Sequence, residues 1–134
     1  MWYNILQNNS FLKKLYNKVP ELSNIRISEI NIQNEENKIS IIFYLPYYAD
    51  TPPQEWVDAE YNTVFVQVDF LVIHNLYIES ANNCPFIGHA KINLDKNKLI
   101  NIDIIGTLKA KIKAEIGLIR CVNAYLNDPW SEEA

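Results

Sequence analysis

Apolar residues recur at every second position through most of the chain after Pro20, and this period of two constrains the fold more than any other feature. Side chains alternate between the two faces of a β-strand, so the pattern predicts strands with a buried face. The longest run covers residues 62–73, where one face carries Val64, Val66, Val68, Phe70 and Val72. Because the opposite face also carries Phe65, Leu71 and Ile73, we expect a central strand with a helix on one side.

The same alternation predicts further strands at residues 22–33, 38–45, 76–79, 90–94, 100–104 and 108–116. In the first of these, the apolar positions change parity between Ile27 and Ile30, which predicts a β-bulge near Ser28 and Glu29. Residues 34–37 are a polar turn that makes a hairpin with the next strand. Residues 119–126 fit either a last strand or a short helix.

A single amphipathic helix is predicted before these strands, at residues 10–18. Asn9 or Ser10 is suited to cap it, and Pro20 ends it. The apolar positions of this segment are Phe11, Leu12, Leu15 and Val19. We therefore expect one α+β domain over residues 1–134, in which the N-terminal helix packs on a curved, mainly antiparallel sheet of about seven or eight strands. The acidic tail from about residue 128 is expected to fray.

The composition narrows the possible partners and cofactors. The net charge of −4 argues against nucleic-acid binding, which requires a basic surface. Cys84 and Cys121 are far apart and have no Cys or His neighbours in the sequence, so we expect two buried free thiols and no metal site. No apolar run of about 18 residues is present. The N-terminus lacks the pattern of a signal peptide. We expect a cytoplasmic protein with no membrane partner and no cofactor.

A search for catalytic groups gives no combination that supports an enzyme. His74 and His89 stand at strand ends, without a nucleophile or an orienting partner in the sequence pattern. Only Gly88, Gly106 and Gly117 are present, too widely spaced for a phosphate-binding loop. We therefore predict that the chain is not an enzyme.

Residues 46–61 are the longest segment without a strand or helix pattern, and we expect them to form an irregular loop. Tyr and Trp dominate binding hot spots, and several carboxylates stand beside them here. We predict that this loop binds a partner protein through Tyr47, Tyr48, Asp50, Glu55, Trp56 and Asp58. Two alternatives remain open: Trp56 and one tyrosine close the end of the sheet, or binding uses the row formed by Lys109, Lys111 and Lys113.

Three segments carry a resemblance to a known family: NNSFLKKLYNKVPELSNIRISEINI, the strand ending FYLP with TPPQEW behind it, and YNTVFVQVDFLVIHNLYIES. In these the chain resembles immunity protein 50, a family of bacterial immunity proteins from polymorphic-toxin systems. The resemblance implies a small α+β protein that neutralises a toxin by binding it, with no catalytic step. It carries over no assigned binding residues.

Other functions are compatible with the residue pattern. A small-molecule carrier with an apolar pocket between helix and sheet is the alternative to toxin binding, and large side chains at every inward position would argue against it. A hydrolase that uses the carboxylates of residues 46–61 is a third hypothesis. It would require two carboxylates facing each other across a cleft.

Overall fold

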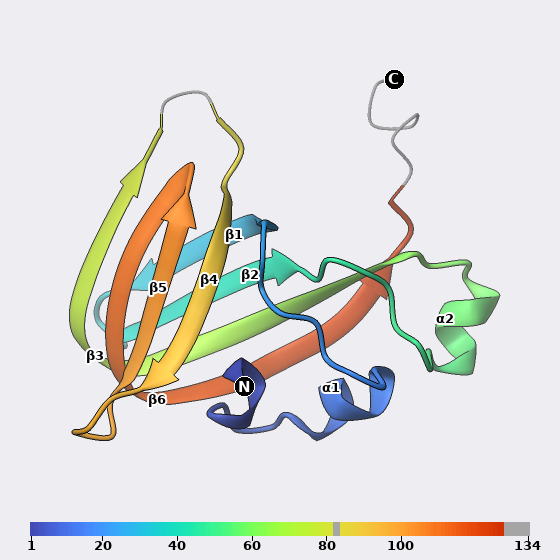
Figure 1. The fold of residues 1–134 in the computed structure, drawn as a ribbon, viewed down its shortest axis with the longest axis horizontal. Helices are drawn as coiled ribbons and strands as arrows, with labels where there is room; N and C mark the ends of the chain where they lie inside the picture. Colours follow the sequence, from blue (N-terminus) through green and yellow to red (C-terminus); the bar gives the residue numbers. More distant parts are fainter. Residues whose placement is uncertain (82–83, 128–134) are drawn as a thin grey trace.

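A computed structural model describes residues 1–81 and 84–127. Its main feature is an antiparallel sheet of six strands that closes in the order β1-β2-β3-β6-β5-β4 (Figure 1). The strands are β1 Ile25–Gln33, β2 Lys38–Tyr44, β3 Thr63–Ser80, β4 Ile87–Leu94, β5 Ile100–Gly106 and β6 Leu108–Tyr125. The predicted antiparallel sheet is confirmed, whereas the predicted number of strands, seven or eight, is wrong.

The strand count is lower because β3 and β6 each have 18 residues, and the sequence pattern divided both of them. In β3 the pairing with β6 shifts register between Ile73 and Asn75, so the alternation breaks there. In β6 the apolar pattern breaks near Gly117, although the strand continues to Tyr125. Residues 119–125 are therefore the end of β6 and do not form a separate element.

The strand register shifts at three places in the described ladders. The bulge predicted near Ser28 is confirmed, since the register of β1 against β2 shifts between Ile27 and Glu29. Between β3 and β6 the register shifts at Gln67/Val68 and at Ile73/Asn75. Just before the second of these, Val72 has φ 58°, a conformation that is unfavourable for a β-branched residue. Asn37 in the β1–β2 turn holds it: the Val72 N–H donates to the Asn37 carbonyl, and the Ile73 N–H donates to Asn37 Oδ1, both at 3.0 Å. Beyond this point β3 separates from β2.

The helices are short and lie outside the strand segments: η1 Trp2–Asn4, α1 Ser10–Leu15 and α2 Gln54–Asp58. The predicted helix at residues 10–18 is thus confirmed only as far as Leu15. Asn9 is its N-cap residue, but the Asn9 side chain donates to the carbonyls of Tyr3 and Leu6 and does not cap the helix. Phe11 was predicted on the apolar face, and its side chain is 41% exposed.

The core lies between the two halves of the curved sheet and under the N-terminal segment (Figure 1). The predicted buried face of β3 is confirmed, with Val64, Val66, Val68 and Phe70 each at most 1% exposed. Leu12 and Leu15 of α1 and Trp2 of η1 belong to the same core, and the Trp2 indole N–H donates to the Pro20 carbonyl. The prediction fails at Val72, where φ is positive and the side chain is 37% exposed.

Candidate functional site

The predicted binding loop, residues 46–61, packs against the N-terminal segment instead of standing free. It contains α2, so the prediction of a fully irregular loop is wrong. Trp56 of α2 is 6% exposed, and its ring meets the Phe11 ring edge-on with centroids 5.9 Å apart. Tyr48 is half-buried, and the centroids of the Tyr48 and Trp56 rings are 6.4 Å apart. Trp56 and Tyr48 thus pack against each other, and Trp56 also packs against Phe11 of α1.

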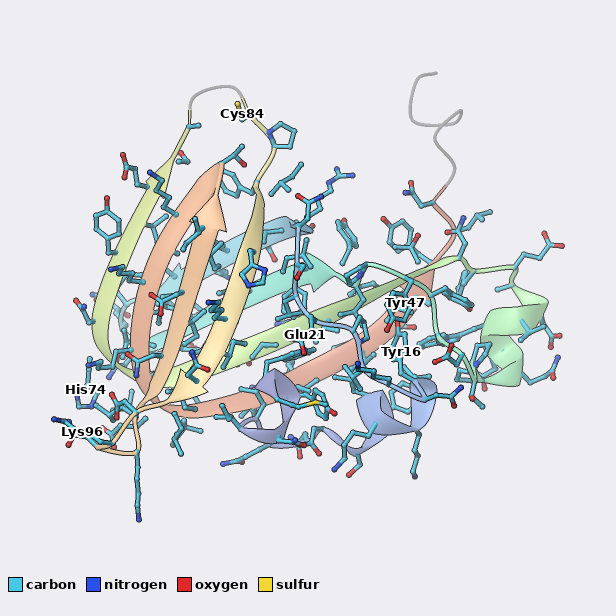
Figure 2. All side chains as sticks on the ribbon, in the orientation of Figure 1. Tyr16, Glu21, Tyr47, His74, Cys84 and Lys96 are labelled. Carbon is cyan, nitrogen blue, oxygen red and sulfur yellow. The ribbon has the colours of Figure 1, made fainter. Side chains whose placement is uncertain are left out.

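Hydrogen bonds tie the beginning of the loop to the segment after α1. The Tyr16 hydroxyl donates to the Tyr47 carbonyl at 2.7 Å, and the Tyr47 hydroxyl donates to the Lys18 carbonyl at 3.0 Å. The Asn17 N–H donates to the Asp50 carboxylate at 2.9 Å. Figure 2 shows Tyr16 and Tyr47 beside each other. Burial of Tyr16 raises the pKa of its hydroxyl, and the nearby Tyr47 and Asp50 raise it further. The loop is therefore held in one conformation.

The carboxylates of the loop remain accessible. Asp50, Glu55 and Asp58 are all exposed, and the Asp58 carboxylate accepts a hydrogen bond from the Gln54 amide within α2. Tyr47 keeps 48% of its surface exposed. The loop thus presents an acidic surface with one accessible aromatic ring, while Trp56 and most of Tyr48 support the fold.

The histidines and cysteines lie apart from one another and from this loop. His74 pairs with Glu115 at 2.9 Å, and both side chains are about half exposed at the opposite end of the sheet (Figure 2). His89 is half-buried in β4. The expectation of two buried thiols is wrong, since Cys84 is exposed and Cys121 is only partly buried. Within residues 1–81 and 84–127, no three His, Cys, Asp or Glu side chains are placed to hold a metal ion.

Asp69 is the one buried carboxylate among the described residues, and it lies on the outer face of β3 at 1% exposure. The Ser40 hydroxyl and Arg120 Nε both donate to it at 2.7 Å, and the Gln67 amide is 3.4 Å away. Burial raises the pKa of Asp69, but these hydrogen bonds and the charge of Arg120 outweigh it, so the pKa is lower than usual. The cluster ties β2, β3 and β6 together and stays ionised.

We expect Asp69→Asn to lower the free energy of unfolding by about 1–3 kcal/mol near neutral pH. The pKa of Asp69 is lower in the folded protein than in the unfolded chain, where it is about 4. The ionised Asp69 therefore stabilises the fold above the unfolded pKa, and this stabilisation is lost as the pH falls through the folded pKa. Urea unfolding of the parent and Asp69→Asn at a series of pH values measures this. The two stabilities should converge in acid, and an equal gap at about pH 6 and pH 3 would contradict the assignment.

The sequence analysis missed an aromatic cluster on the outer face of β2, β3 and β6. Tyr125 lies between Tyr44 and Phe65, with ring centroids at 5.8 and 6.3 Å, and the Arg26 guanidinium lies 5.5 Å from the Tyr44 ring. Ser28 and Ile42 complete an open depression of about 280 Å³ there. Tyr44 and Phe65 both stand on the face opposite the core face of their strands, but only the strand register shows that they are neighbours.

The lysine row lies on the outer face of β6, where Lys109 and Lys111 are exposed. Lys113 is partly covered and pairs with Asp95 at 3.6 Å. Asp103 of β5 is the register partner of Lys111, and Glu79 of β3 is the register partner of Lys109. Because acidic residues flank the row on both sides, it forms a mixed-charge face and not a basic patch.

The interior of the sheet is filled. The cavity between its two halves has a volume of about 10 Å³ and is lined by core residues such as Ile41, Phe70 and Ile102. That is roughly the space of one water molecule. Within the part of the chain that the structure describes, large side chains therefore occupy the place where a carried small molecule would sit.

The described residues thus define a class of fold, a closed antiparallel sheet whose interior is filled by side chains. In the described residues, no helix is long and apolar enough to cross a membrane. The chain belongs to the immunity protein 50 family, whose model matches residues 8–124. The resemblance stated from the sequence is thereby confirmed. Neither a curated protein nor a solved structure matches the chain.

Proposed function

We propose that the protein is a bacterial immunity protein that binds a cognate toxin in the cytoplasm and neutralises it without catalysis and without a cofactor. The observation that carries this proposal is the family match over residues 8–124, because it spans both halves of the sheet. A toxin-binding protein needs a stable scaffold and an exposed contact surface of about 800 Å². The loop tied to α1 and the bulged, closed sheet supply a scaffold of this kind.

The filled interior favours this function over the small-molecule carrier, which would need a pocket of about 300 Å³ or more. The loop carboxylates do not favour a hydrolase, because Asp50 and Asp58 are exposed and are hydrogen-bonded to other groups of the chain. A carboxyl group that acts as a general acid at neutral pH needs apolar surroundings to keep its proton.

We further propose that residues 47–58 form part of the toxin contact. Asp50, Glu55 and Asp58 attract a basic toxin, and Tyr47 is the side chain of this loop with the most accessible aromatic surface. Exposed charges act mainly on the rate of association, through fields that salt screens within about 10 Å at 0.1 M.

We expect the triple variant Asp50→Lys, Glu55→Lys and Asp58→Lys to bind the toxin roughly ten times more slowly at low salt and to lose most of its salt dependence. Binding kinetics at several salt concentrations measure both effects. The matched control is Glu21→Lys, Glu29→Lys and Asp103→Lys, three carboxylates outside both the loop and the β1–β2 turn that change the net charge by the same amount.

Equal slowing in both triple variants would assign the effect to net charge and not to the loop. Absence of toxin binding by the parent protein, together with no protection of cells that express the toxin, would contradict the proposed function itself. Circular dichroism of each variant confirms that the sheet is intact.

A further inference from the structure

The second half of β3 has a free edge that begins where β3 leaves β2. The pairing of β2 with β3 ends at Lys38 and Leu71, and from there on the described strand that pairs with β3 is β6 alone. The hydrogen bonds from Val72 and Ile73 to Asn37 hold the chain at this divergence. A free strand edge presents unpaired backbone donors and acceptors to any other extended segment.

The ladder with β6 determines which backbone groups are free. The Ala81 N–H donates to the Thr107 carbonyl at 2.9 Å, so this pair is hydrogen-bonded across the ladder. In an antiparallel ladder such pairs alternate, which places the N–H and C=O groups of Glu79 and Tyr77 toward β6. The N–H and C=O groups of Leu76, Ile78 and Ser80 point away from β6. Their spacing matches the backbone of one more β-strand.

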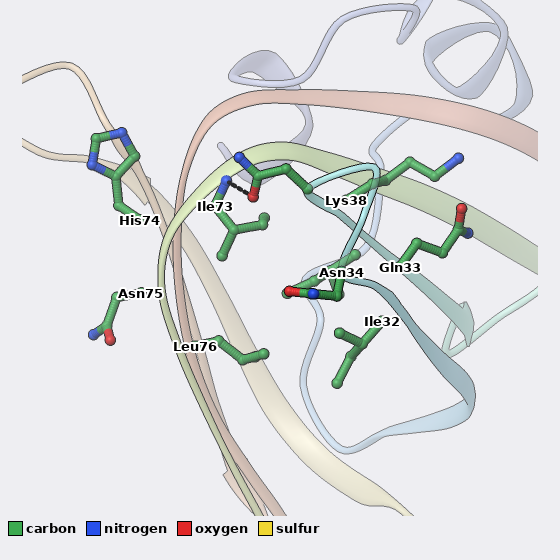
Figure 3. A pocket seen from close by; sticks show the side chains of 10 residues that line it. Ile32, Gln33, Asn34, Lys38, Ile73, His74, Asn75 and Leu76 are labelled. Carbon is green, nitrogen blue, oxygen red and sulfur yellow. Dashed lines mark hydrogen bonds between the residues drawn. The ribbon is translucent and has the colours of Figure 1, made fainter.

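A groove of about 250 Å³ lies beside this edge, between β3 and the β1–β2 hairpin, and its lining mixes apolar side chains with polar ones such as Asn34, Asn37 and His74. Figure 3 shows Ile32 of β1 and Leu76 of β3 extending into it from opposite sides. These two side chains are 50% and 39% exposed. Leu76 and Ile78 are the register partners of the buried residues Ile112 and Ala110 of β6. The apolar surface of the groove is therefore continuous with the core and opens at the free edge.

The outer face of the same strand is polar and acidic. Tyr77 and Glu79 point to this side, and the Tyr77 hydroxyl donates to the Glu79 carboxylate at 2.6 Å. A strand added at the edge would place its own outward side chains next to these two residues. Opposite charges on neighbouring strands are favourable, so a Lys or Arg is the best neighbour for Glu79.

We propose that residues 76–80 of β3 accept an extended segment of the toxin, which adds to the sheet as a further strand. The segment alternates apolar residues, which cover Ile32 and Leu76, with polar residues that include a cation beside Glu79. This inference rests on the proposed function, since the occupant is the toxin, but it uses a different surface: α2 and the far end of β3 lie at opposite ends of the molecule (Figure 1).

The first test compares Leu76→Lys with Ile105→Lys. Both replace an exposed apolar strand residue by lysine, but Leu76 borders the free edge and Ile105 is 67% exposed on β5. A lysine that points inward at an edge blocks strand addition. We expect Leu76→Lys to weaken toxin binding by at least about 30-fold, the loss of one hot-spot side chain. The expectation for Ile105→Lys is a change of less than about twofold. If the parent protein binds the toxin and Leu76→Lys binds it equally well, the strand addition is wrong but the proposed function stands. If the parent protein does not bind the toxin, the proposed function is wrong as well.

The second test reads the backbone directly. Amide hydrogen exchange followed by NMR should show fast exchange at Leu76, Ile78 and Ser80 in the free protein and slow exchange in the toxin complex. Tyr77 and Glu79 should be protected in both states, because their N–H groups already bond to β6. This alternation distinguishes strand addition from simple covering of the surface. Unchanged exchange at the three edge amides would contradict the proposal. Protection of the three edge amides in the free protein that increases with protein concentration would also contradict the proposal. It would indicate that the edges of two copies of the protein pair with each other.

Discussion

Replacing Phe70 by alanine should lower the free energy of unfolding by about 3–5 kcal/mol, the range for deleting a fully buried aromatic ring. Phe70 is 1% exposed and lies at the centre of β3, with Ile39 of β2 and Gly117 of β6 as its register partners. Its ring shares the space beside Gly117 with Leu6 and Ile100: a Cβ at Gly117 would lie 2.7 Å from Leu6 Cδ2, 3.1 Å from Ile100 Cδ1 and 3.3 Å from Phe70 Cδ1. Because Phe70 lies between β2 and β6, removal of its ring takes contacts from both sides of the core. We therefore expect the neighbouring side chains to move little into the cavity left by the ring.

Phe65→Ala is the matched control for this prediction. Phe65 lies on the same strand and is also aromatic, but it is half-buried on the outer face in contact with Tyr125. We expect a loss of about 1 kcal/mol, which is typical of one aromatic pair on a sheet surface. Urea unfolding followed by circular dichroism measures both variants. Equal losses would mean that the inward face of β3 is assigned incorrectly.

Replacing Gly106 by alanine should destabilise the fold by about 3 kcal/mol, the upper end of the range for overpacking. Gly106 ends β5 at the corner where β4, β5 and β6 meet, and Thr107 bonds there to the backbone of Ile87. A Cβ at Gly106 would overlap the Ile87 carbonyl oxygen and lie 2.5 Å from Gly88 Cα. Both are backbone atoms, so no change of side-chain rotamer relieves the overlap.

Gly88→Ala provides the comparison, because Gly88 is the register partner of Gly106. A Cβ at Gly88 would find its nearest atoms, Ile104 Cγ2 and the Ile105 carbonyl oxygen, at 3.0 Å. Both contacts are short by only a few tenths of an ångström, so a small shift of the Ile104 side chain and of the Ile105 backbone relieves them, and we expect a loss of about 1 kcal/mol. Thermal and urea unfolding of the two variants check the order. A Gly106→Ala variant as stable as the parent would show that the corner adjusts freely.

The strands and the buried face were predictable from the sequence because their signal is local. The alternation of Val64, Val66 and Val68 depends only on neighbouring residues, as does the change of parity at Ser28. The number of strands was not predictable in this way. The register shift between Ile73 and Asn75 interrupts the pattern, yet the strand continues because β6, far away in sequence, pairs with β3 on both sides of the shift.

The candidate site was predictable only in its composition. Pro52 and Pro53 indicated an irregular segment, but proline near the first turn also favours a helix, and α2 begins directly after Pro53. The sequence placed Trp56 among the contact residues, whereas Phe11 covers its ring in the fold. The free edge of β3 had no signal in the sequence, since it exists only because β2 begins at Lys38, opposite Leu71, whereas β3 continues to Ser80.

The pairing of the two long strands also bears on when this protein can become active during its synthesis. Leu76 pairs with Ile112 and Ser80 with Leu108, so the distal half of β3 has no partner until the first half of β6 has been made. Thr63 at the other end of β3 pairs with Tyr125, the last residue of β6. Contacts between residues so distant in sequence form slowly, and unpaired strand edges are exposed to aggregation in the meantime. A nascent chain that has not yet released β6 from the ribosome can pair β1, β2 and the first half of β3, but it cannot complete the sheet.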